Sequence, residues 1–90
     1  MQLSKHAELR LRSRGIQDLS ILLVQQFGHS FKSRDNSEIW IANKRARREI
    51  LKLVKAVQQD FERPDPLYAV TAADGTVITT GRRIQKIRRR

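Results

Sequence analysis

Residues 43–66 read NKRARREILKLVKAVQQDFERPDP, and this stretch decides how the rest of the chain is organised. Its apolar side chains recur every three or four residues, which is the period of one helix face. A helix over residues 44–62 is predicted, because the Asn43 side chain can cap its first turn while Pro64 and Pro66 cannot continue it. The apolar face of this helix comprises Ala46, Ile50, Leu53, Val54, Val57 and Phe61.

A β-hairpin is predicted on each side of this helix. After it, residues 67–72 and 76–80 are rich in β-branched side chains, and Asp74-Gly75 between them favours a tight turn. Before it, Phe31 lies in a short strand, turn-forming side chains follow, and residues 38–42 alternate as a second strand would.

Two shorter helices are predicted at the N-terminus. Ser4 can cap the first, over residues 5–14, and Gly15 can end it in the left-handed conformation. Its buried stripe would comprise Leu3, Ala7 and Leu11. The second helix, over residues 19–27, follows Asp18 as its expected cap. It is apolar nearly all round, so we expect it to be largely buried.

The predicted order is therefore α-α-β-β-α-β-β, which is an α+β fold. We expect one compact domain over residues 1–81, followed by a basic tail over residues 82–90. A small twisted antiparallel sheet made of the two hairpins, with the helices packed on one face, would bury all three apolar stripes. A chain of 90 residues supports one modest core and leaves little room for a deep, enclosed active site.

Positive charge is the strongest feature of the composition. The chain has 19 Lys and Arg residues against 9 Asp and Glu residues, a formal net charge of +10. Self-repulsion makes such a surplus costly to fold, so a polyanionic partner is the usual reason to keep it. Arginines outnumber lysines, and a guanidinium group can hold phosphate with two parallel hydrogen bonds. The sequence favours a nucleic acid over an acidic protein or an anionic membrane surface.

Several other classes of function are disfavoured. The chain has no cysteine, which excludes disulfides, thiolate catalysis and a cysteine-based zinc site. With two histidines and no suitably spaced carboxylate pair, we expect no metal and no cofactor. No apolar run approaches the roughly 18 residues that cross a membrane, and the N-terminus lacks an apolar signal segment. We therefore expect a cytoplasmic protein with no membrane partner.

His6, Arg10 and Arg14 are the candidate catalytic residues. Their four-residue spacing puts them on one face of the first helix. The imidazole could move a proton while the guanidinium groups hold a phosphodiester and stabilise its transition state. The alternative is an ordinary polar face, in which Arg10 and Arg14 pair with carboxylates such as Glu8 or Asp18.

The candidate nucleic-acid-binding residues fall in two segments. They are Lys44, Arg45, Arg47, Arg48, Lys52 and Lys55 in the long helix, and Arg82, Arg83, Lys86 and Arg88 in the tail. Cations at a helix N-terminus oppose the helix dipole, and a bound phosphate would offset that cost. The alternatives are a solvated helix face with an Arg45–Glu49 ion pair, and a tail that only improves solubility.

The remaining polar-aromatic residues give weaker indications. Trp40 and Tyr68 fall on predicted strands, where they could belong to the core or offer a ring face to a base. His29 opens a strand directly after a helix, which favours a structural role over a catalytic one.

The N-terminal segment carries the pattern S-K-H-A-x-x-R-x-x-x-R-G-I from Ser4 to Ile16. It resembles the opening of a family of small bacterial domains of unknown function, and residues 70–80 resemble that family's closing strands. The resemblance covers about the first third and the last quarter of the chain. The basic helix over residues 44–62 departs from the family's simpler pattern, because it lies between the two hairpins.

The resemblance implies a bacterial protein of plasmids, phages or other mobile elements, similar in size and layout to the RelE-like ribonuclease toxins. By that analogy, His6, Arg10 and Arg14 would be active-site or RNA-contact residues, and an acidic, antitoxin-like protein would be a partner. The leading hypothesis is a basic RNA- or DNA-binding domain, with metal-independent endoribonuclease activity as its catalytic form. A non-catalytic DNA-binding or regulatory protein and a module that docks on an acidic protein are the alternatives.

Overall fold

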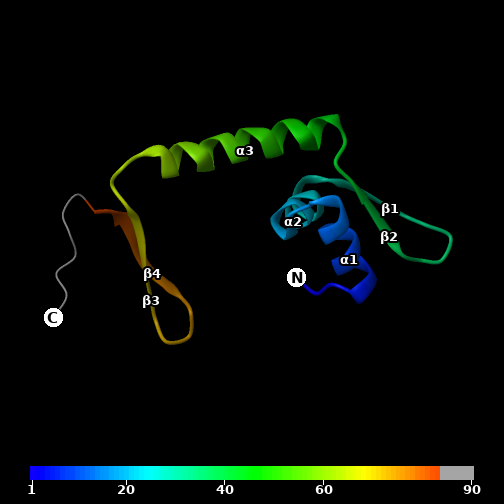
Figure 1. Cartoon of the computed structure of the whole chain (residues 1–90), viewed down its shortest axis with the longest axis horizontal. Coiled ribbons are helices and arrows are strands. Elements are labelled where there is room, and N and C mark those ends of the chain that lie inside the picture. Colours follow the sequence, from blue (N-terminus) through cyan, green and yellow to red (C-terminus); the bar gives the residue numbers. More distant parts are fainter. Residues whose placement is uncertain (84–90) are drawn as a thin grey trace. The chain divides into compact units, whose positions relative to one another are not determined.

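A computed structural model describes residues 1–83, which form three α-helices and two antiparallel β-hairpins (Figure 1). In chain order the elements are α1 (Lys5–Arg14), α2 (Asp18–Phe27), β1 (His29–Lys32), β2 (Glu38–Ile41), α3 (Lys44–Glu62), β3 (Leu67–Thr71) and β4 (Val77–Arg82). The predicted α+β class and the order α-α-β-β-α-β-β are confirmed.

The structure divides into two compact units, with the boundary inside α3. The first unit covers Met1–Lys52, and the second begins at Leu53. The first holds α1, α2, the β1–β2 hairpin and the start of α3, while the second holds the rest of α3 and the β3–β4 hairpin. The prediction of one compact domain over residues 1–81 stays a prediction.

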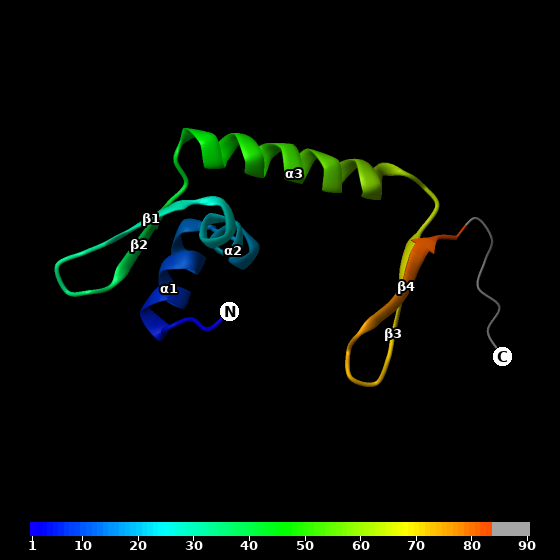
Figure 2. The ribbon, with the colours of Figure 1, turned by 180° about the vertical axis from the view of Figure 1, so that it is seen from behind.

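The two hairpins form separate two-stranded sheets, so the expectation of one shared sheet is wrong. Strands β1 and β2 pair from His29↔Ile41 onward, and α2 leads directly into this hairpin (Figure 2). Strands β3 and β4 pair in the same antiparallel way, with an irregularity after Val70. Turn chemistry and alternation identify a hairpin within a sequence, but they do not say which other strands it pairs with.

Helix caps form largely as predicted. The Ser4 hydroxyl accepts a hydrogen bond from the Ala7 amide at 3.1 Å, and Gly15 ends α1 in the left-handed conformation at φ 65°. The Asn43 side chain caps α3 by accepting from the Ala46 amide at 2.9 Å.

Asp18 does not cap α2 as expected. It is the first residue of the helix, and the preceding Gln17 occupies the cap position without a side-chain hydrogen bond. A carboxylate in the first turn still interacts favourably with the helix dipole, which explains why the acid occurs there.

Burial is slight in the described part of the chain. Leu11 is 8% exposed and Ala46 is 2% exposed, while Leu3 and Ala7 are half-buried and confirm the inward stripe of α1. The expectation that α2 is largely buried is wrong, since none of its side chains is buried and Leu19 is 64% exposed. An apolar pattern shows which side chains would gain from burial, but it does not show whether a chain this short has enough other elements to cover them.

The turn between β1 and β2 is held by Asp35. Its carboxylate accepts hydrogen bonds from the Ser33 hydroxyl, from the Ser37 hydroxyl at 2.6 Å and from the Ser37 amide at 3.1 Å. These bonds lower the pKa of Asp35 from 3.8 to about 2, and the bond from the Ser33 hydroxyl has the largest effect. Because the folded pKa is the lower one, their stabilisation is present above pH 4 and is lost as the pH falls through about 2. Asp74 holds the second turn in the same manner, accepting from the Thr76 amide at 3.0 Å.

Gly28 lies where α2, β1 and β2 meet. Its amide donates to the Val24 carbonyl at 2.7 Å, and the backbone of Ile41 passes close by. A Cβ atom at this position would lie 2.4 Å from the Val24 oxygen and 2.8 Å from the Ile41 oxygen. Both neighbours are backbone atoms, so they cannot move aside without shifting the helix or the strand.

Gly28→Ala is therefore expected to lower the free energy of unfolding by about 2–3 kcal/mol, the range of an overpacked site. Urea denaturation followed by circular dichroism measures the loss. Gly81→Ala is the matched control, because the atoms nearest to its Cβ would belong to the Tyr68 side chain, at 3.1 Å, and that ring can shift. Equal losses in the two variants would contradict the proposed backbone clash.

Candidate nucleic-acid interface

The candidate catalytic residues lie on the solvent side of α1. His6, Arg10 and Arg14 are all exposed, and each lies about one helical turn, roughly 6 Å of rise, from the next. The Ser13 hydroxyl, which is nearby in sequence, donates to the Arg10 carbonyl at 3.1 Å and so serves the helix backbone. The structure thus keeps the three predicted residues on one accessible helix face.

Ion pairs do not neutralise the predicted basic sites of α1 and α3. Within residues 1–83, ion pairs join Arg63 to Asp65 at 3.1 Å and Arg82 to Asp60 at 3.2 Å, and no others occur. The alternative in which the arginines of α1, or Arg45, pair with neighbouring carboxylates is therefore not what the structure shows.

The first half of α3 has a well-defined inward side and outward side. Ala46 is 2% exposed and Ile50 is half-buried, so these two side chains point into the first unit. Five predicted nucleic-acid-binding residues of this segment are exposed, namely Lys44, Arg45, Arg47, Arg48 and Lys52. Lys55 is exposed as well, one turn further along the same helix. The first turn of α3 contains no acidic residue.

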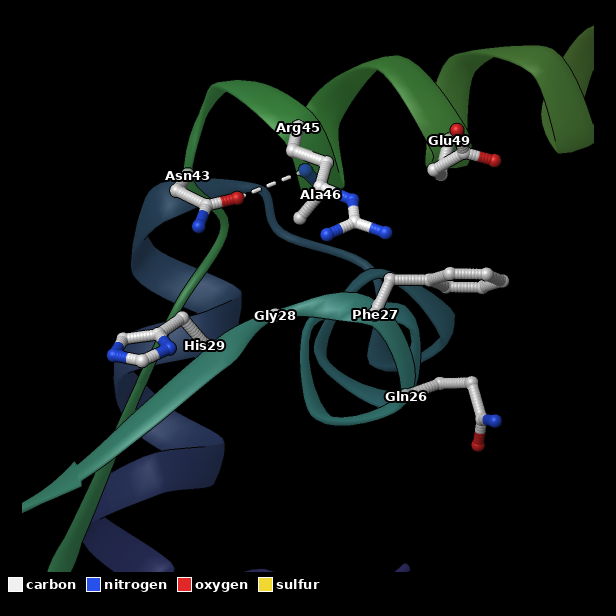
Figure 3. A pocket seen from close by; sticks show the side chains of 8 residues that line it. All are labelled: Gln26, Phe27, Gly28, His29, Asn43, Arg45, Ala46 and Glu49. Atoms are coloured by element: carbon white, nitrogen blue, oxygen red, sulfur yellow. Dashed lines mark hydrogen bonds between the residues drawn. The ribbon is translucent and has the colours of Figure 1, made fainter.

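A cavity of about 320 Å³ lies beside the N-terminus of α3 (Figure 3). Its lining residues are Gln26, Phe27, Gly28, His29, Asn43, Arg45, Ala46 and Glu49. In Figure 3 the Arg45 guanidinium group points from α3 toward Phe27 and Gly28, while the His29 ring points away from them. Arg45, a predicted phosphate-binding residue, therefore reaches into a cavity that the first turn of α3 helps to line.

Sequence reasoning did not find this cavity. Its walls come from residues 26–29 and 43–49, which no spacing rule connects. His29, which the sequence assigned to a structural role, is exposed at the edge of the cavity. The available indication was Gly28, since a glycine between a helix and a strand often marks a close backbone approach.

Arg82, the last residue of β4, and Arg83, which follows it, have different surroundings. The Arg82 guanidinium group donates to the Asp60 carbonyl at 2.9 Å and to the Asp60 carboxylate at 3.2 Å, and its side chain is only 19% exposed. Arg82 thus binds the C-terminal end of α3. Arg83 is exposed, and its guanidinium carbon lies 5.1 Å from the centre of the Tyr68 ring. Lys86 and Arg88 lie outside the described residues.

Tyr68 is not an open platform for a base. Its ring lies against Gly81, the residue paired with it across the hairpin, at a distance that leaves a Cβ only 3.1 Å of room. The Arg83 guanidinium group also lies over this ring. Trp40, on β2, is 39% exposed, so of the two predicted stacking residues it is the one with an accessible side chain.

Residues 1–83 contain no group of three or more His, Asp or Glu side chains that could hold a metal ion. None of their helices has the combination of length and apolar composition that a membrane crossing requires. Comparisons with protein-family models, with curated proteins and with solved structures find no match to this chain.

The role of Arg82 can be tested by its effect on stability. Arg82→Ala is expected to lower the free energy of unfolding by about 1 kcal/mol, because it removes a cationic donor from the last carbonyls of a helix. Arg82→Lys keeps the charge without the planar fork and should recover less than half of the loss. Arg83→Ala, which removes only an exposed contact with a ring, should cost about 0.5 kcal/mol or less. Urea unfolding of all three distinguishes these values, and a larger loss for Arg83→Ala would contradict the assignment.

Proposed function

We propose that this protein binds nucleic acid through phosphate contacts made by the outward side of α3. The observation that carries the proposal is the set of five exposed cations in the first half of this helix, none of them in an ion pair within the described residues. A polyanion is the partner that offsets the cost of holding these charges together.

The position of the charges strengthens this argument. The N-terminus of a helix carries a partial positive charge, so Lys44, Arg45 and Arg47 raise an already positive potential. Asn43 satisfies the amide of Ala46 only, while the first turn of any helix presents several amides without an intrahelical partner. A phosphate oxygen near this turn would meet both backbone amides and guanidinium groups.

The cavity beside this turn fits the same function. Arg45 reaches into it, and Gly28 and Asn43 line it near the helix start, while Phe27 and the acidic Glu49 line it as well. The cavity is far too small for a nucleotide polymer, but it has room for one phosphate group with its water. We therefore assign Arg45 to a single backbone phosphate, with Lys52 as a second contact along the helix.

Binding should depend steeply on salt and on these side chains. For a single-stranded oligonucleotide, each phosphate contact contributes about 0.7 to the slope of log K against log salt. Arg45→Ala combined with Lys52→Ala should reduce that slope by about 1.4 and weaken binding roughly tenfold at 0.15 M salt. Fluorescence anisotropy with a labelled oligonucleotide over a salt series measures both quantities.

Lys32→Ala combined with Arg34→Ala is the matched control, because both residues are exposed near the β1–β2 turn and the variant loses the same charge. It should keep the slope of the unmodified protein. If both double variants weaken binding equally, net charge alone explains it and the proposed interface is wrong. If the unmodified protein ignores oligonucleotides in dilute buffer and binds an acidic protein, the docking-module alternative is favoured.

A metal-independent ribonuclease is the second candidate function, favoured by the accessible face that His6, Arg10 and Arg14 share on α1. An imidazole can transfer the proton of an attacking ribose hydroxyl, and adjacent guanidinium groups can stabilise the charge on the phosphate. The toxin-like, bacterial character of the chain belongs to this candidate. A cytoplasmic location likewise remains an expectation of the sequence.

This second candidate has a direct test. With EDTA present, the unmodified protein should cleave a labelled RNA, while His6→Ala should lose at least about 100-fold in rate, the usual contribution of a general acid or base. His29→Ala is the matched control and should keep the rate. Binding of RNA should survive in both variants, and an RNA that stays intact with the unmodified protein would leave binding as the function.

A further inference from the structure

Because Ala46 and Ile50 point into the first unit, they determine which residues of α3 point away from it. At about 100° per residue, Arg48 lies about 180° from the line midway between Ala46 and Ile50. Lys44 and Lys52 lie about 40° to either side of Arg48. Arg45 lies about 60° from Arg48 on the same side as Lys52, and Arg47 lies about 100° from it on the same side as Lys44, so cations flank Arg48 on both sides.

A nucleic acid that meets this surface must accommodate a whole helix. An α-helix with its side chains is about 10–12 Å across, and the major groove of B-form DNA is about 12 Å wide. The major groove of A-form RNA is deep and narrow, and side chains do not read it. Cations on both sides of Arg48 also suit a groove, since a helix inserted between two strands has a phosphate backbone on each side.

Single-stranded nucleic acid suits this surface less well. Proteins that bind single strands combine a basic groove with aromatic rings on which the bases stack. The outward side of α3 between Lys44 and Lys52 carries no aromatic residue. It does carry Leu51, which is 63% exposed among the cations. An exposed aliphatic side chain in a helix that enters the major groove can contact the methyl group of thymine.

We infer that α3 is a DNA-reading helix, whose N-terminal half enters the major groove of duplex DNA. Arg48 faces the base edges, where a guanidinium group can hold O6 and N7 of guanine. Arg45 and Arg47 face the two backbones, and Lys44 and Lys52 lie between. This inference rests on the proposed binding function and adds the kind of nucleic acid and the residue that reads it.

The first test compares three probes of one sequence and length: duplex DNA, duplex RNA and single-stranded RNA. At equal salt, duplex DNA should bind at least about tenfold more tightly than either RNA probe. Equal or tighter binding of an RNA probe would overturn the inference while leaving the proposed function standing. Failure of all three probes in dilute buffer would instead remove the proposed function itself.

The second test identifies the reading residue. Selection of bound duplexes from a random pool should show a guanine preference with the unmodified protein, and Arg48→Ala should reduce that preference at one position by about tenfold. Lys52→Ala should weaken binding to all duplexes alike and leave the preference unchanged. Arg34→Ala, near the β1–β2 turn, should change neither. A base preference that survives Arg48→Ala would show that Arg48 does not read the base, and circular dichroism confirms that each variant is folded.

Discussion

The burial of Ala46 at the start of α3 is the constraint on which the functional interpretation depends. At 2% exposure this small side chain fixes which side of the helix faces into its unit, and the Asn43 cap fixes where the helix begins. Lys44, Arg48 and Lys52 then point away from the first unit as a geometric consequence, while Arg45 lines the cavity beside the helix N-terminus. A helix free to rotate about its own axis would present no defined surface, and the same charges would mean only that the chain is soluble.

The same region shows why so few buried residues can still give a specific arrangement. Gly28 allows the end of α2 and the backbone of β2 to approach within a distance that no side chain would permit. The close approach brings residues 26–29 beside the first turn of α3, and the cavity that receives Arg45 is formed there. In a chain too short for a large apolar core, this close packing of backbone against backbone helps to hold α2 and β2 in place.

Much of the fold could be predicted from the sequence, because helices, caps and tight turns are decided by neighbouring residues. Ser4, Gly15 and Asn43 act as local chemistry dictates, and Asp74 with Gly75 marks a real hairpin. What failed was everything that depends on distant partners: the shared sheet, the burial of α2 and the cavity. Periodicity shows that one face of an element is apolar. Which residues cover that face depends on how the whole chain folds, so a local pattern cannot predict them.

The arginines illustrate the same distinction within the candidate site. Arg48 and Arg82 are chemically identical and were predicted from the same excess of charge, yet their surroundings differ. The Arg82 guanidinium group donates hydrogen bonds to the carbonyl and the carboxylate of Asp60, so it stabilises the C-terminal end of α3. Arg48 lies opposite the buried side of that helix and is in no ion pair within residues 1–83. A count of basic residues therefore overstates the proposed nucleic-acid surface, because cations that the fold itself uses, such as Arg82, do not belong to it.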